Sequence, residues 1–473
     1  MRSRFLFTLV AVFTAVLLHA QSQTGSNPPA AGQASSDSGY IAAQDNPQSE
    51  SPATPSDPST PWLPVMINGE SPIPAFSGEL ERGNTLRGGM SFSSGYDDNA
   101  ALENGKAVDN VSYSFAPSIS LQQSQARALW DLSYNPGFVV NQRVSELNSN
   151  TQAAGLNFQY RFSQYLTFRA HDNFSFTNSP FSDPTTEADS APGSVLHPAD
   201  ASVLTPFARR VSNLGGVDLI YRAGEGTIIG GSGSSYLLNY DNLGGGPGIA
   251  LIDTRISGGD AFYSHRLVPN QWIGLTYSFQ RLDFNGGVEQ TDSNSALLFY
   301  TITPRAHLTL SLFGGASYSQ TTGQVAVIST LPLTASTQQW LPSAGVIVGW
   351  QGIRTGVSAT FSRRVDGGGG LLGTVDRYNG SFEVRRQFAP RWMGTIGLLY
   401  DDDHPIDLTS EGTFRTLSAT AGVQRQVGQN WTVGLNYSRV HQDYGIVSAA
   451  QLFPDHNRAL LSISYFFSRP LGK

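Results

Sequence analysis

Three places in the C-terminal part of the chain bring histidine and aspartate together: Asp403-His404, His441-Gln442-Asp443 and Asp455-His456. An imidazole beside a carboxylate can act as a general acid or base when both groups reach the same reacting atom. These residues give a hydrolase hypothesis. Adjacent Asp-His pairs also arise by chance in polar loops, so this hypothesis depends on how the surrounding elements present the side chains.

Carboxylates also gather in three predicted polar loops: Asp97-Asp98, Glu187-Ala188-Asp189, and Asp401-Asp402-Asp403 with Asp407. Carboxylate oxygens are the ligands that calcium prefers, but the twelve-residue spacing of a calcium loop is missing. A solvated acidic loop is the simpler interpretation. Gly367 to Gly370 lack the lysine and serine of a phosphate-binding loop, and a flexible loop explains them. We therefore predict no metal and no cofactor.

The composition excludes several classes of protein. The chain has 473 residues, a net charge of −7 and no cysteine. Without cysteine it has no disulfide scaffold, no thiolate metal site and no cysteine nucleophile. The acidic balance lacks the basic footprint of a nucleic-acid-binding protein. Only 14% of the residues are charged, against about 25% in soluble domains, so an ordinary soluble surface is missing.

The N-terminal part has two segments that we do not expect to fold. Residues 1–20 pair arginines with the apolar run Phe5 to Leu18, which predicts a secretory signal peptide; an uncleaved anchor helix is the alternative. Residues 21–84 are rich in Ser, Pro, Ala and Gln and predict a disordered leader. Within it, Trp62 to Ile67 is either a docking or plug segment or a linker beside the fold.

Beyond residue 85 the sequence alternates with period two. Val111, Tyr113 and Phe115 are interleaved with Ser112 and Ser114, which predicts a strand with one apolar and one polar face. The same alternation returns along the chain, for example at Ile273 to Phe279 and at Leu461 to Phe467. It is less regular at Thr227 to Tyr240, Ile252 to Leu267 and Ser295 to Ile302, where glycines or bulges could intervene.

The connections alternate between tight turns and long polar loops, which include Ser319 to Thr337 and Val365 to Val375. This alternation predicts about eighteen strands in an all-β, antiparallel, up-and-down transmembrane β-barrel spanning residues 85–473, with both termini periplasmic. A soluble sandwich or propeller is the alternative, but it would need more surface charge. Lipid contact explains the low charge directly.

Aromatic residues directly follow several tight turns, and rings at a constant level near strand ends form the interfacial girdle of a barrel. We assign to this girdle Tyr165, Trp272, Trp392 and Trp431.

Strand parity also selects the charged side chains of the lumen face. Arginines there outnumber carboxylates, which would favour anions in an aqueous channel. The alternative is that these arginines only pair with lumen carboxylates and water. The predicted lumen residues are Arg127, Arg161, Arg169, Arg222, Arg364, Arg385, Arg458, Asp131, Asp218 and Glu383.

The features that carry a family resemblance are the leader, the repeated hairpins, the segment Ser94 to Ala100 and the closing segment Ile463 to Phe467. In these features the chain resembles the outer-membrane β-barrel porins of Gram-negative bacteria. Similar barrels accompany exopolysaccharide loci. The resemblance implies outer-membrane lipids, lipopolysaccharide and the barrel-assembly machinery as partners, with polysaccharide export components as a further class. The chain departs from the usual assembly signal because Ser468 to Lys473 follow Phe467.

We therefore expect a non-enzymatic, porin-like channel for small polar or anionic solutes in the outer membrane. The first alternative is a structural or export barrel that works with exopolysaccharide machinery. The second is a rim hydrolase, although outer-membrane proteases with aspartate and histidine at the barrel mouth are smaller barrels. The sequence predicts no nucleic-acid partner and identifies no oligomer interface.

Overall fold

A computed structural model describes residues 84–100, 107–177, 208–242, 251–305, 307–325, 333–370, 372–406, 412–445 and 455–471. The predicted signal peptide, nearly all of the predicted leader and the segment Trp62 to Ile67 lie outside the described residues. Glu187, Asp189 and Asp407 also lie outside them.

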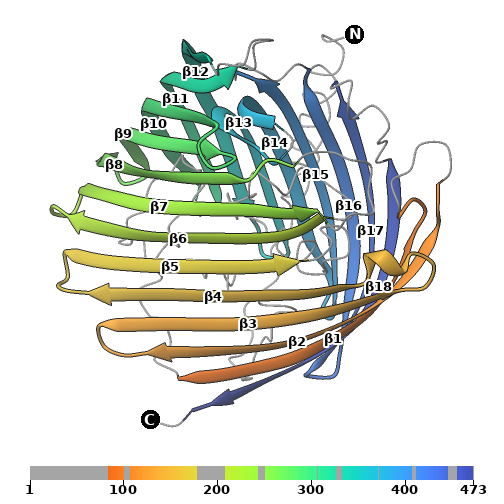
Figure 1. Ribbon diagram of the computed structural model, residues 1–473. Helices are drawn as coiled ribbons and strands as arrows, with labels where there is room; N and C mark the ends of the chain where they lie inside the picture. The colour runs from red at the N-terminus through yellow and green to blue at the C-terminus, as the bar shows by residue number, and fades with distance from the viewer. Residues whose placement is uncertain are drawn as a thin grey trace, which may run out of the picture. The chain divides into compact units, whose positions relative to one another are not determined.

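The described chain is built from strands joined in sequence order (Figure 1). The strands are β1 (Thr85–Asp97), β2 (Asn110–Ser124), β3 (Ala128–Asn141), β4 (Ser149–Arg161), β5 (Leu166–Thr177), β6 (Ala208–Arg222), β7 (Thr227–Asn242), β8 (Thr254–Val268), β9 (Gln271–Phe284), β10 (Glu289–Arg305), β11 (Leu308–Val325), β12 (Leu333–Gln351), β13 (Thr355–Gly368), β14 (Leu372–Ala389), β15 (Trp392–Pro405), β16 (Phe414–Val427), β17 (Trp431–Tyr444) and β18 (His456–Pro470).

Each strand pairs with its neighbours in sequence, and β1 pairs with both β2 and β18, from Thr85↔Pro470 to Asp97↔Arg458. The sheet is therefore a closed, 18-stranded antiparallel barrel that leaves no open end strand. This confirms the predicted fold class and strand number. The described chain enters and leaves at the end with the tight turns, which we call the short-turn end; the other end is the loop end.

Contacts across the barrel identify its two faces. Thr291 of β10 bonds to Thr374 of β14, which is not its neighbour, so the odd-numbered face of β10 points into the lumen. Leu298, on the even-numbered face, is 56% exposed and points outward. Large apolar side chains are exposed on the outward face of the other strands in the same way. An apolar exterior around a polar interior suits lipid outside and water inside.

The glycine pairs Gly230-Gly231 of β7 and Gly258-Gly259 of β8 do not form bulges, although the sequence suggested bulges in this region. The register of β7 and β8 is continuous through Gly230 and Gly259. A Cβ atom placed on Gly230 would lie 2.3 Å from the ring of Phe262, so this glycine makes room for an inward-facing aromatic side chain. Parity is irregular here because apolar residues also point inward.

Some strands are longer than predicted. β11 continues to Val325 and β12 begins at Leu333, where the sequence predicts one loop from Ser319 to Thr337. Polar residues continue the alternation beyond the apolar band, so composition alone does not mark the end of these strands. The described residues hold one short 3₁₀ helix, η1 (Ser145–Leu147).

No helix among the described residues is long and apolar enough to cross a membrane.

Hydroxyl groups link the inward faces of β10, β11 and β12. The Oγ atom of Ser317 lies 2.7 Å from that of Ser295 and 2.6 Å from that of Ser343. Nearer the short-turn end, Thr301 and Ser311 make a similar bond of 2.9 Å. Such cross-strand pairs stabilise a sheet and satisfy buried hydroxyls. They form a continuous hydroxyl-lined wall beside the hairpin described next.

Candidate functional site

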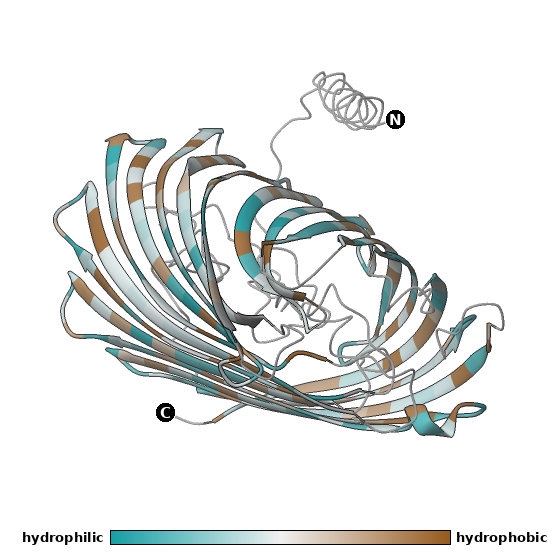
Figure 2. Cartoon of the chain, turned by 45° about the horizontal axis from the view of Figure 1, so that its top comes forward, coloured by the Kyte–Doolittle hydropathy of each residue, from teal (hydrophilic) through white to brown (hydrophobic). Residues whose placement is uncertain are grey.

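The hairpin formed by β13 and β14 leaves the barrel wall and turns into the lumen (Figures 1 and 2). β12 pairs with β11 along its whole length, but it pairs with β13 only from Ala344↔Arg363 to Gln351↔Gly356. Beyond Arg363, β13 remains paired with β14 alone. We call residues 364–376 the inward hairpin.

A proline explains where the wall separates. The N–H of Gln351 bonds to His307 on the β11 side, whereas the N–H of Gly352 bonds toward β13. Because main-chain groups alternate sides along a strand, the even-numbered residues of β12 face β13. The next even residue after Ala344 is Pro342, which has no N–H to donate. The ladder between β12 and β13 therefore ends there.

The tip of the inward hairpin docks on the far wall. The Oγ1 atoms of Thr374 and Thr291 are 2.6 Å apart, the hydroxyl of Tyr240 donates to the carbonyl of Gly369 over 3.1 Å, and the N–H of Ile252 donates to Gly370 over 2.8 Å. Gly369 and Gly370 have φ of +63° and +88°, a region that glycine adopts without strain.

Apolar packing supports this docking. Leu372 and Val375 of the hairpin are fully buried, and so is Leu282 of β9. A Cβ atom placed on Gly367 would lie within 4.0 Å of the side chains of Thr254 and Leu282. Burying Leu372 and Val375 contributes about 1.5–3 kcal/mol each. The hairpin therefore narrows the lumen between β13–β14 and the wall formed by β7 to β10.

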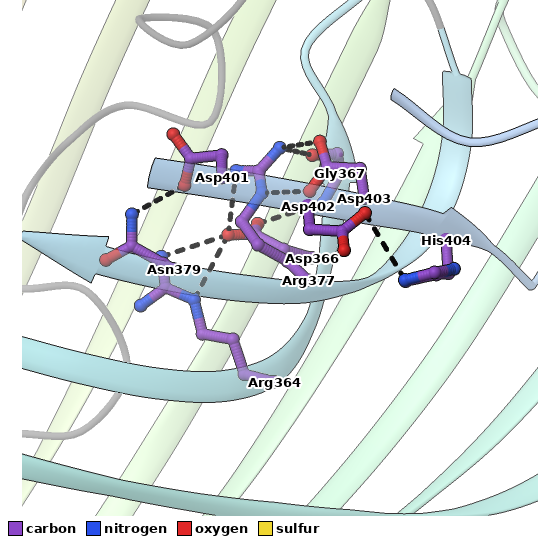
Figure 3. A network of polar contacts seen from close by, with 9 residues as sticks. All are labelled: Arg364, Asp366, Gly367, Arg377, Asn379, Asp401, Asp402, Asp403 and His404. Carbon is purple, nitrogen blue, oxygen red and sulfur yellow. Dashed lines mark hydrogen bonds and ion pairs between the residues drawn. The ribbon is translucent and has the colours of Figure 1, made fainter. Parts of the chain in front are cut away.

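An ion network anchors the root of the hairpin (Figure 3). The guanidinium group of Arg377 donates to both carboxylate oxygens of Asp403, over 2.7 and 2.8 Å, and to the carbonyl of Gly367 over 3.0 Å. It also lies 3.4 Å from Asp366, which accepts two bonds from Arg364 over 3.0 and 3.2 Å. The side chains of Arg377 and Asp403 are 4% and 0% exposed, so neither charge has water to replace its partner.

The electrostatics of the network keep Asp366 ionised. Burial by itself opposes ionisation of this carboxyl, but Arg364 and Arg377, with the N–H of Gly367, hold the pKa of Asp366 below its ordinary value. The Nδ2 atom of Asn379 also donates to Asp401 over 2.6 Å. The network thus joins β13, β14 and β15 at the level where the hairpin leaves the wall.

Nine of the ten predicted lumen residues lie on strands, with the parity of the inward face: Arg161, Arg169, Arg222, Arg364, Arg385, Arg458, Asp131, Asp218 and Glu383. Arg364 belongs to the ion network, and Arg458 is buried near the loop end. Their contact with a permeating solute stays a prediction. The tenth, Arg127, lies in the exposed turn between β2 and β3. The assignment of Arg127 to the lumen wall is corrected, because this residue comes after the regular pairing of β2 has ended.

Arginine is concentrated at the short-turn end. Among the described residues within three positions of the tight turns or of the outer ends of β1 and β18, Glu225 is the one carboxylate. The arginines in the same zone are Arg87, Arg127, Arg161, Arg222, Arg266, Arg305, Arg354, Arg391, Arg425 and Arg469. Arg87, Arg161, Arg222 and Arg266 have inward parity, and with Arg385 slightly further along β14 they form what we call the arginine collar.

Three of the four predicted girdle residues are exposed next to the tight turns, Tyr165, Trp392 and Trp431 at 47%, 37% and 48%. The assignment of Trp272 is wrong. Its side chain is 3% exposed and packs in an inward cluster with Ile220, Ile228 and Phe262. The physical reason is parity, because Trp272 shares the face of Gly274, opposite the outward Leu275.

The structure brings His441 and Asp455 of the hydrolase hypothesis together, but it does not gather the three Asp-His sites into one. Asp403 points inward and is bound to Arg377, whereas His404, the next residue of the strand, lies on the other face, 3.3 Å from Asp402. Elsewhere, His441 contacts Asp455 on an exposed surface of the loop end. Among the described residues, no group of three or more carboxylate and histidine side chains could hold a metal ion.

Sequence inspection missed the inward hairpin. It interprets Gly367 to Gly370 as a flexible loop within a connection from Val365 to Val375, but the structure extends both strands and makes these residues the docked tip. Two signals were available. Pro342 marks an interrupted ladder, and Arg377 places a charge on a lumen face that must find a partner.

Comparisons with protein-family models and with curated protein sequences found no match. Among solved structures, the chain is similar to the ferric citrate transporter FecA, with a TM-score of 0.43 and 10% identity over 82% of this chain. It spans 64% of the FecA chain. It is also similar to the outer-membrane protein OpdK of Pseudomonas aeruginosa, with a TM-score of 0.40 and 11% identity over 81% of this chain and 99% of OpdK. Pseudomonas aeruginosa OpdQ gives a TM-score of 0.40 and 10% identity over 82% of this chain and 99% of OpdQ.

Proposed function

We propose that this protein is a porin-like channel of a Gram-negative outer membrane that passes small polar or anionic solutes. The observation that carries the proposal is a closed barrel with an apolar exterior and a polar lumen, narrowed by a docked hairpin. A barrel of this strand number is wide enough for an aqueous channel unless something fills it. A hairpin held at defined points narrows such a channel.

The arginine collar supports the choice of anions. Arg161, Arg222 and Arg385 have inward parity, and their fixed positive charge attracts anions into a narrow opening. Near the loop end, by contrast, Arg364 and Arg377 are paired with carboxylates. We propose that the collar, rather than the ion network, sets the charge preference of the channel.

In this proposal the short-turn end faces the periplasm, as the short connections of outer-membrane barrels do. The predicted signal peptide would export the chain, and the barrel-assembly machinery would insert it among phospholipid and lipopolysaccharide. Polysaccharide export components remain a proposed partner class of the alternative in which the barrel does not conduct.

Reversal potentials in planar bilayers under a salt gradient test the proposal. The wild-type channel should favour anions, and Arg161→Glu together with Arg385→Glu should shift the potential toward cation preference. Arg386 is the matched control, because it follows Arg385 on the same strand but has outward parity. Arg385→Gln should weaken the anion preference, whereas Arg386→Gln should leave it unchanged.

Two results would contradict the proposal. A folded, reconstituted barrel that never conducts, even without residues 21–84, would favour the structural or export role. A conducting barrel whose reversal potential ignores Arg161 and Arg385 would retain the channel and remove these arginines from its selectivity.

A further inference from the structure

The outward face of β5 to β8 has a hollow whose polar border is poorly suited to contact with lipid tails. Asp172 is the seventh residue of β5 and is exposed on this outward face. On the outward faces of the described strands it is the one carboxylate within ten residues of the short-turn end. Because about ten residues of a strand cross the apolar core, Asp172 lies near mid-membrane.

The hollow beside Asp172 has a volume of 560 Å³. Its lining includes Leu156, Ala170, Val217 and Ser235, which have outward parity, with Gly215 and Gly233 between them. The neighbouring positions His171, Gly216, Ser234 and Gly258, which have inward parity, also line it. Across the same strands the outward face continues with Ser257 and Gly259. Elsewhere at this depth the outward face carries large apolar side chains, such as Leu275, Leu398 and Leu435.

A polar pair lies at the edge of the hollow. The Nδ2 atom of Asn213 donates to Oδ1 of Asp172 over 3.1 Å. Both side chains are on the outward face, because Asp172 is opposite Gly215 and Asn213 is opposite Phe174 in the β5–β6 ladder. One amide bond leaves most of the hydrogen-bonding capacity of a carboxylate unused. Lipid tails can supply none of it, so a charged side chain at this depth is costly unless another protein surface covers it.

We propose that this hollow is the contact surface of a homodimer, with a second copy of the chain as its occupant. The acceptor Asp172 and the donor Asn213 lie side by side, so a two-fold axis through the hollow would bring each carboxylate to the amide of the other copy. That reciprocity is the property of an isologous interface.

The depth of Asp172 and Asn213 and the small side chains around the hollow also favour a second copy of the chain as the occupant. An axis along the membrane normal places identical residues of two barrels at identical depth, so Asp172 meets Asn213 in the layer where both occur. Glycine and serine on β6, β7 and β8 allow the two walls to approach closely, as small residues do between membrane segments. A lipid tail could fill the volume of the hollow, but it has no donor for Asp172.

Because the chain has no cysteine, single-cysteine variants give a clean test in reconstituted bilayers. Ser235→Cys, inside the hollow, should form a disulfide-linked dimer on oxidation, with a yield several-fold above that of Leu398→Cys. Leu398 is a matched control, since it is exposed at the seventh position of β15, nine strands around the barrel from β6. Adding Asp172→Leu and Asn213→Leu to Ser235→Cys should reduce the yield to the control value.

Native mass spectrometry supplies the second measurement. We expect twice the chain mass for the wild-type protein and a single chain mass for the variant with leucine at Asp172 and Asn213. Equal cross-linking of Ser235→Cys and Leu398→Cys would overturn the proposal. A wild-type mass of one chain carrying a bound lipid would also overturn it and identify lipid as the occupant. Neither result depends on whether the barrel conducts.

Discussion

Single side chains decide how the inward hairpin is held. Arg377 reaches Asp403, Asp366 and the carbonyl of Gly367 from one buried guanidinium group. Removing one partner of such a buried pair typically costs about 3–5 kcal/mol, because the remaining charge has no water to replace it. The network therefore acts as a clamp on the root of the inward hairpin, and it is sensitive to the ionisation of its carboxylates.

The protonation of Asp366 makes the stability of this clamp depend on pH. Its lowered pKa means that its stabilising contribution is fully present above about pH 4, the unfolded value of an aspartate, and is lost as pH falls through the lowered value. We expect the single-channel conductance to rise in acid below about pH 4, because a protonated Asp366 no longer binds Arg364 and Arg377 as an anion.

Asp366→Asn provides the comparison, because an amide removes the charge at every pH. This variant should show the larger conductance already at pH 7 and a weaker response to acid than the wild-type channel. If the variant and the wild type respond identically from pH 7 to pH 2.5, other carboxylates control the hairpin.

At the scale of elements, β13 and β14 each perform two tasks. From Thr355 to Arg363, β13 pairs with β12 and belongs to the wall; beyond Arg363 it forms a hairpin that rests on β7, β9 and β10. Pro342 makes the change possible, because it ends the ladder on the side of β12 that faces β13. The wall and the constriction are thus parts of the same two strands.

Shortening the hairpin should widen the channel. Replacing Gly367 to Thr374 with Asn-Gly, a two-residue turn suited to a β-hairpin, removes the docked tip and keeps Asp366 opposite Val375. We expect a larger single-channel conductance in planar bilayers, since the tip no longer crosses the lumen.

A cysteine pair checks that the docked position is the resting one. The Oγ1 atoms of Thr291 and Thr374 are 2.6 Å apart, so Thr291→Cys with Thr374→Cys should form a disulfide and retain the wild-type conductance when oxidised. A large fall in conductance on oxidation, reversed by reductant, would show that the hairpin conducts from another position.

At the scale of the whole molecule, charge is distributed unequally along the barrel axis. The described short-turn end has ten arginines and one carboxylate, Glu225, whereas near the loop end Arg364 and Arg377 are paired with Asp366 and Asp403. A channel whose fixed charge is concentrated at one end conducts unequally under opposite voltages when salt does not screen that charge.

We therefore expect rectification of the current in 0.1 M salt, where the screening length is about 10 Å, and much less in 1 M salt, where it is about 3 Å. A variant with glutamine at Arg161, Arg222, Arg266 and Arg385 should conduct symmetrically in both. Symmetric wild-type current in 0.1 M salt would exclude the collar as the source of asymmetry.

The candidate site was only partly predictable. Inward parity for Arg161 and Arg385 follows from alternation, which is a local property of an extended chain. Arg127 was misplaced because one residue beyond the end of a ladder has no defined face. Trp272 was misplaced because its position after a turn outweighed its parity, and the inward cluster around it joins strands that are distant in sequence.

The sequence by itself determined a barrel of about eighteen strands beginning near Thr85, because period two and the alternation of short and long connections are recorded in local order. Only the tertiary structure decided that residues 364–376 dock across the lumen, that Arg377 binds Asp403, and that Asp172 lies beside a hollow. Each of these depends on strands brought together by barrel closure, and no periodicity along one strand reports which distant residues will face each other.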